Sequence, residues 1–152
     1  MLNRRELLVI CGVWAAAGFP VGGLLKPAHA GPRDAKKRIA ELTGGVKPQK
    51  GRINITLPKV TDQGRFVPIR ISVDSPMTET DHVKAIHIVA ERNPTPEVAS
   101  FRLSAANGKA QISTRIRMLK TQVVVVVEEM SDGSVYLAKG RSKITGGAGG
   151  CG

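Results

Sequence analysis

The run QVVVVVEE at residues 122–129 decides the fold. Its five consecutive valines, Val123–Val127, leave no polar position on either side of an extended chain, so a strand formed here must be covered on both faces. Branched aliphatic side chains of this kind favour packed strands. The run therefore predicts a central strand of a sheet rather than an edge.

Further strands are predicted on both sides of this run. Residues 67–73 alternate Val, Ile, Ile and Val with polar residues or proline, which is the pattern of a half-buried strand. Similar short runs recur at close spacing and bring the expected total to about seven strands. They cover residues 53–57, 83–91, 99–104, 110–118 and 134–141.

Two dipeptides that accept positive φ easily, Asn107-Gly108 and Asp132-Gly133, separate successive runs and predict hairpin turns. We therefore expect the last four strands to pair as neighbours. The length leaves room for about one domain. The economical architecture is all-β, an immunoglobulin-like antiparallel β-sandwich over residues 46–144.

A short helix is expected ahead of the sandwich, in residues 31–45. Pro32 and Asp34 suit a helix start, and Gly44-Gly45 provide a stop. The segment between them is basic and amphipathic.

The first thirty residues predict a twin-arginine-type signal peptide. Arg4-Arg5 precede an apolar stretch, and small residues surround a cleavage point after Ala30. Several glycines interrupt the stretch and Lys26 ends it near the lower limit for spanning a bilayer, which argues against a membrane anchor. The processed protein is expected to begin at Gly31, with no membrane association.

The chain carries 23 Lys and Arg against 12 Asp and Glu, a formal net charge of +11. Nucleic acid is the first partner to consider for such a charge. However, the basic residues are scattered, and aromatic side chains that stack on bases make up only 3% of the sequence. The sequence therefore argues against nucleic-acid binding.

Cysteine usage singles out one thiol. Cys11 lies in the predicted signal peptide, so the exported protein would carry Cys151 alone, in a compartment where disulfides normally form. Glycine, which has no Cβ to restrict the backbone, dominates residues 145–152. These residues predict a flexible arm that bears a mobile thiol. Its glycines are Gly146, Gly147, Gly149, Gly150 and Gly152.

A mobile thiol suits delivery rather than catalysis. Nucleophilic enzymes hold their thiol beside a base on a rigid scaffold, yet the histidine nearest in sequence is His87. His82 and His87 would fall on opposite faces of a strand, which disfavours a metal site. Glu128 and Glu129 diverge and are expected to border a turn. We predict no catalytic residue, metal or cofactor.

Together these features resemble the SoxY family, the carrier subunits of the Sox thiosulfate-oxidation system. The resemblance rests on the leader, on a sandwich of this size and above all on the terminal motif Gly149-Gly150-Cys151-Gly152. The family more often ends Gly-Gly-Cys-Gly-Gly, whereas this chain lacks the last glycine and carries an additional pair at Gly146-Gly147.

The resemblance implies a periplasmic protein that binds sulfur intermediates covalently on Cys151. It also implies a heterodimer with a SoxZ-like subunit, and Sox enzymes that conjugate thiosulfate, hydrolyse the conjugate and oxidise the remaining sulfur. Two alternatives stay open. A soft metal such as copper could pass through Cys151, or a structural sandwich could bind a partner through its sheet edges.

Overall fold

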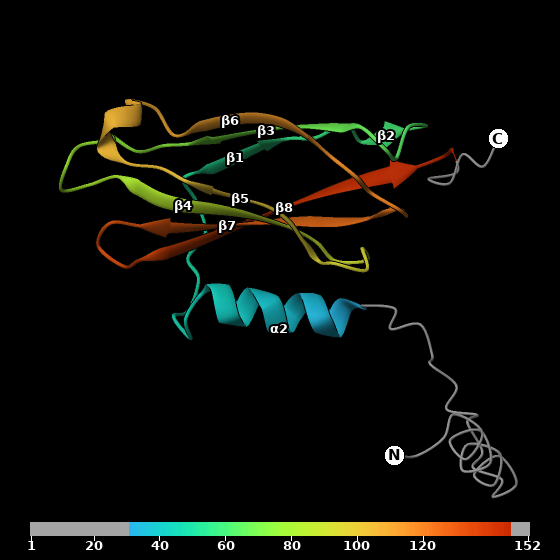
Figure 1. Ribbon diagram of the computed structural model, residues 1–152, viewed down its shortest axis with the longest axis horizontal. Coiled ribbons are helices and arrows are strands. Elements are labelled where there is room, and N and C mark those ends of the chain that lie inside the picture. The colour runs from blue at the N-terminus through green and yellow to red at the C-terminus, as the bar shows by residue number, and fades with distance from the viewer. Residues whose placement is uncertain (1–30, 147–152) are drawn as a thin grey trace, which may run out of the picture.

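A computed structural model describes residues 31–146 of the protein (Figure 1). Two β-sheets face each other, and helix α2 (Pro32–Leu42) lies along the outer side of the larger sheet. The smaller sheet has the strand order β1-β3-β6 and the larger one the order β2-β8-β7-β4-β5. The strands are β1 (Ile53–Thr56), β2 (Val60–Thr61), β3 (Val67–Val73), β4 (Val83–Ala90), β5 (Glu97–Arg102), β6 (Gln111–Ile116), β7 (Gln122–Met130) and β8 (Val135–Ile144).

Strand β7 lies between β8 and β4 in the larger sheet. Its Val124 and Val126 pack into the core between the sheets, while Val125 and Val127 pack on the opposite face with helix α2. All four side chains are fully buried. The prediction that the valine run forms a central strand covered on both faces is confirmed.

The core between the sheets consists almost entirely of aliphatic side chains. Alternation along β3 sends Val67, Ile69 and Ile71 inward, where they join Ile86 and Ile88 from β4 in one cluster. Burying a side chain of this size contributes about 1.5–3 kcal/mol, so this cluster accounts for much of the stability of the sandwich.

Helix α2 follows the sequence expectation closely. Pro32 stands in its first turn, where a missing amide proton costs nothing, and Asp34 Oδ2 accepts a hydrogen bond of 2.7 Å from the Gly31 amide. Ala35 is buried against the valines of β7, and Ile39 lies one turn further along the same face. The helix thereby covers the side of the larger sheet that faces away from the smaller one.

The two predicted hairpins have different outcomes. Asp132-Gly133 joins β7 to β8 as an antiparallel hairpin, as predicted. The prediction for Asn107-Gly108 is wrong, because these residues close the 3-10 turn η1 (Ala105–Asn107), with Gly108 at a φ of 67°. A left-handed glycine ends a helical turn as readily as it forms a hairpin.

The chain crosses at η1 from β5 in the larger sheet to β6 in the smaller one. Strand β6 pairs with β3, so of the last four strands only β7 and β8 are neighbours, and the expectation that all four pair is also wrong. The short strand β2, which the sequence did not predict, runs parallel to β8.

The all-β, immunoglobulin-like sandwich with a short N-terminal helix is confirmed. The predicted signal peptide, residues 1–30, lies outside the described part of the chain. Within residues 31–146 no helix has the length and apolar character needed to cross a membrane.

Candidate functional site

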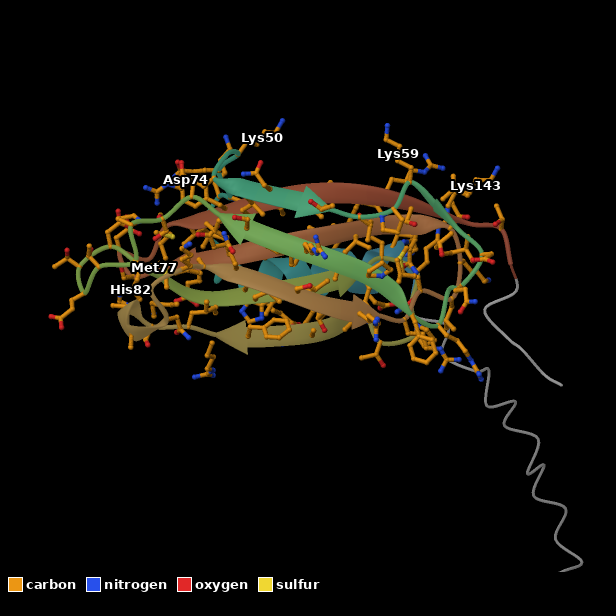
Figure 2. The ribbon with its side chains drawn as sticks, turned by 90° about the horizontal axis from the view of Figure 1, so that it is seen from above. Lys50, Lys59, Asp74, Met77, His82 and Lys143 are labelled. Atoms are coloured by element: carbon orange, nitrogen blue, oxygen red, sulfur yellow. The ribbon has the colours of Figure 1, made fainter. Side chains whose placement is uncertain are left out.

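The end of β8 is the root of the predicted arm, and it is held in place by β2. The Lys143 amide donates to the Lys59 carbonyl, and the Thr145 amide donates to the Thr61 carbonyl, each over 2.9 Å. Figure 2 shows Lys59 and Lys143 at the same end of the sandwich. This short parallel pairing fixes the direction in which the chain leaves the domain.

The loop between β6 and β7 holds the same root from the other side. Thr121 Oγ1 accepts a hydrogen bond of 2.9 Å from the Ile144 amide and lies 3.4 Å from the Ile144 carbonyl oxygen. Beside it, the buried Gln122 donates from Nε2 to Asn93 Oδ1 (2.9 Å), and Asn93 Nδ2 donates to the Arg117 carbonyl (2.7 Å). Satisfied buried networks of this kind make a loop rigid.

Only the first residues of the predicted arm fall within the described chain. Thr145 is hydrogen-bonded to β2, and Gly146 lies so close to the Asp62 backbone that a Cβ there would overlap the Asp62 carbonyl oxygen. The fixed part of the chain therefore continues through Gly146. The other arm residues, which include the predicted attachment site, lie outside the described residues: Gly147, Gly149, Gly150, Cys151 and Gly152.

Replacing Gly146 with alanine should loosen this root. The added Cβ has to displace the Asp62 backbone, which would disturb the adjacent Thr145–Thr61 hydrogen bond. We expect the amide of Thr145 to exchange its hydrogen about tenfold faster, as measured by NMR. Gly140→Ala, within β8 itself, is the matched control, because its Cβ would meet Ile55 at an ordinary 3.4 Å. Equal exchange in the two variants would mean that the contact between Gly146 and Asp62 does not hold this root in place.

A cluster of titratable side chains that the sequence did not reveal lies under helix α2. His87 Nδ1 is 3.1 Å from Glu97 Oε1 and 2.9 Å from Ser100 Oγ, and Arg38 Nε donates to Glu97 Oε2 over 2.8 Å. Burial would raise the pKa of Glu97, but the hydrogen bonds from Arg38 and His87 outweigh it and hold the pKa below its usual value.

Ser100, His87 and Glu97 are the residue types of a hydrolase triad, but their geometry differs from that of a triad. In a triad, the serine and the carboxylate bind opposite nitrogens of the histidine ring. Here Ser100 and Glu97 share the same nitrogen, Nδ1 of His87. The arrangement ties the helix to β4 and β5 and provides no relay from a nucleophile to a base.

Glu128 occupies a position that sequence reasoning misjudged. It lies within β7 rather than at a turn, its side chain is fully buried, and neither carboxyl oxygen has a hydrogen-bond partner among residues 31–146. Its pKa is raised to about 7, mainly because burial disfavours the charged carboxylate. The positive charge of Arg52 lowers the pKa and partly offsets this effect, whereas the negative charge of Asp81 raises it further. The neighbouring Glu129 points outward to Lys84, 2.8 Å away, so the expected divergence of the two carboxylates holds.

Within residues 31–146, neither His82 nor His87 belongs to a group of side chains that could hold a metal. His82 Nδ1 lies 3.0 Å from the Thr78 carbonyl oxygen, whereas His87 belongs to the cluster under the helix. Across residues 31–146 no three His, Cys, Asp or Glu side chains gather closely enough to hold a metal ion. The copper alternative depends on Cys151, which lies outside these residues.

Solved structures share the fold of this chain at low sequence identity. A superoxide reductase (neelaredoxin) variant from Ignicoccus hospitalis is 14% identical, with a TM-score of 0.55 over 74% of this chain and 91% of its own. A putative superoxide reductase from Thermotoga maritima is 11% identical, with a TM-score of 0.53 over 64% and 93%. At such identities the likeness concerns the fold alone.

Sequence comparison identifies the family. No curated protein matches the chain. The profile of the family described as sulfur oxidation protein SoxY matches residues 39–151, a span that includes the sandwich and Cys151. Proteins of this family serve sulfur oxidation as carrier subunits, together with Sox partners such as SoxZ. This chain therefore belongs to the SoxY family of sulfur oxidation proteins.

Proposed function

We propose that this protein carries intermediates of thiosulfate oxidation as covalent adducts of Cys151 and presents them to partner enzymes. The observation that carries the proposal is the family match, which covers residues 39–151 and so includes both the sandwich and Cys151. The protein supplies the attachment point, and the partner enzymes supply the catalysis.

The chemistry at Cys151 begins with an oxidation. The thiolate and the sulfane sulfur of thiosulfate form a disulfide bond, and two electrons leave to an acceptor in the conjugating enzyme. Water then cleaves the bond to the sulfonate sulfur in a second enzyme, releasing sulfate and two protons and leaving a persulfide on Cys151. The thiolate is the reactive form of the cysteine.

A tether with a fixed root suits this role. The hydrogen bonds of β8 hold the chain through Thr145, and the contact with Asp62 extends this to Gly146. Five further residues, 147–151, lead to the sulfur, and a fully extended chain of that length spans at most about 17–18 Å. In our proposal the glycine-rich segment swings within this radius and enters the narrow cleft of a partner.

The same proposal includes the cellular setting. The protein would be exported in the folded state through the twin-arginine route into the periplasm, as a heterodimer with a SoxZ-like subunit. Removal of the signal peptide takes away Arg4, Arg5, Lys26 and Glu6, so the processed protein would carry a net charge of +9, which would attract anionic sulfur compounds and partly offset the repulsion between them. Cys151 is the residue on which every step depends.

Intact mass measurement tests the attachment site. The processed heterodimer is incubated with thiosulfate and the conjugating enzyme, and the wild-type chain should gain the mass of one thiosulfonate group. Cys151→Ser should show no gain, because a serine hydroxyl cannot form a disulfide bond. An undiminished mass gain in the variant would reject Cys151 as the attachment site.

A second variant separates the arm from the thiol. Cys151→Ser combined with Ser113→Cys places an exposed thiol on the rigid outer face of β6. We expect it to remain unconjugated, since a thiol without a tether cannot enter a cleft. If the wild-type protein instead bound Cu(I) through Cys151 and took up no thiosulfate, the metal-carrier alternative would replace the present proposal.

A further inference from the structure

Residues 59–66, here called the docking rim, run along the end of the sandwich from which the tail departs. The rim carries two of the three exposed large apolar side chains found in residues 31–146, Val60 at 57% exposure and Phe66 at 64%. The third, Val46, is 46% exposed and lies in the segment that leads from helix α2 to β1. Val60 and Phe66 both belong to the segment whose strand β2 pairs with the end of β8.

The docking rim is held in a defined shape although most of it is exposed. Its strand β2 pairs with the last residues of β8. Further along, the buried Gly64 accepts a hydrogen bond of 2.7 Å from the Met118 amide, and the Phe66 amide lies 3.4 Å from the Gln63 carbonyl oxygen. Phe66 is thus presented from a fixed backbone, which lowers the entropy lost on binding.

The charge of the docking rim and its neighbours is strongly positive. Asp62 is the acidic residue of the rim, and it forms no ion pair with another residue of 31–146. The surrounding cations are exposed, and they too lack a carboxylate partner within residues 31–146. They are Lys59, Arg65, Arg117, Lys120 and Lys143.

The length of the tether brings the docking rim against any enzyme that receives Cys151. Only residues 147–151 separate the fixed Gly146 from the sulfur, a span of at most about 17–18 Å. If the cleft encloses the adduct, most of residues 147–151 have to lie inside it. The surface around Gly146, which the rim supplies through Asp62 and β2, must then touch the mouth of the cleft.

We propose that the docking rim binds an acidic surface with an apolar pocket for Phe66, located around the cleft of the partner enzyme that receives Cys151. This inference rests on the proposed carrier function and adds the surface that recognises the enzyme. The cations guide the encounter and set its dependence on salt. Phe66 acts as the apolar anchor of the complex.

The test uses the processed heterodimer as the substrate of the thiosulfate-conjugating enzyme, with two pairs of matched variants. Phe66→Ser is compared with Val46→Ser, and Lys59→Glu is compared with Lys50→Glu. Figure 2 shows that Lys50 and Lys59 lie at opposite ends of β1. All four side chains are exposed, so all variants are expected to fold, which circular dichroism verifies.

We expect Phe66→Ser to lower kcat/KM for the enzyme about tenfold, through KM rather than kcat. Lys59→Glu should lower it severalfold at low ionic strength, and the loss should shrink as salt is added. The two control variants should stay within about twofold of the wild-type protein.

Two outcomes would overturn the proposed role of the docking rim and leave the proposed carrier function standing. In the first, the wild-type protein becomes conjugated and the rim variants match the controls in kcat/KM. In the second, the rim variants lose the SoxZ-like subunit on size-exclusion chromatography, which would assign the rim to the heterodimer interface. By contrast, a wild-type protein that gains no adduct on Cys151 would overturn the proposed function itself.

Discussion

Deleting residues 147–152 should abolish conjugation to thiosulfate and leave the stability of the domain almost unchanged. The buried clusters of the sandwich are built within residues 31–146, and the hydrogen bonds that hold the end of β8 come from Lys143, Ile144 and Thr145. We therefore expect the free energy of unfolding to stay within about 0.5 kcal/mol of the full-length value in chemical denaturation. The intact mass assay should show no adduct.

A longer deletion provides the control for this experiment. Removing residues 143–152 also removes the hydrogen bonds that Lys143, Ile144 and Thr145 donate to Lys59, Thr121 and Thr61, respectively. We expect that protein to be destabilised by several kcal/mol, since each bond contributes about 1 kcal/mol and Ile144 packs against the core. Partner binding that survives the shorter deletion, with no adduct on the wild-type protein, would favour the structural module over the carrier.

Glu128→Gln should stabilise the protein at pH 8. The folded state holds the pKa of Glu128 at about 7, against an ordinary value of 4.5, because burial disfavours the charged carboxylate. Between these two pH values Glu128 is ionised in the unfolded chain but still protonated in the folded protein. The free energy of unfolding is therefore highest below pH 4.5 and decreases as the pH rises to about 7. Each pKa unit corresponds to about 1.4 kcal/mol, so the loss above pH 7 reaches about 3 kcal/mol.

Thermal or chemical denaturation across this pH range measures the effect. Glutamine has nearly the same shape and no charge, so the variant should lose the decline between pH 4.5 and 7 and exceed the wild-type stability at pH 8. Glu129→Gln is the matched control: its exposed ion pair with Lys84 is worth less than about 1 kcal/mol. Parallel pH profiles for wild type and Glu128→Gln would mean that the buried carboxyl group is not the cause.

The sequence predicted those parts of the fold whose residues leave a single physical solution. Val123–Val127 have no polar face, so a strand formed there has to be covered on both sides and therefore lies inside a sheet. Asp132-Gly133 separates two strand-forming runs by only a few residues, so these runs pair with each other as a hairpin. Asn107-Gly108 has the same local chemistry, but a preference for positive φ does not specify which strand the chain meets next. Strand β2 has two residues, too few for any periodic pattern.

The candidate site was predicted unevenly for similar reasons. Cys151 stands out because its neighbours are glycines, whereas the root of the tether depends on hydrogen bonds between segments far apart in the sequence, such as Thr145 to Thr61. The burial of Glu128 did leave a signal: it shares the period-two face of Val124 and Val126, which points into the core. The prediction that Glu128 borders a turn was wrong because it followed from the charge of the side chain and not from its position in the strand.

The attachment of β8 also determines how the domain responds to mechanical force. The hydrogen bonds between β8 and its antiparallel neighbour β7 run across the strands, so a pull on the C-terminal chain along β8 loads many of them together in shear. Strand β2 and Thr121 resist the same pull. In the proposed carrier, tension that a partner applies to the C-terminal chain would therefore load β8 in shear rather than peel it from the sheet.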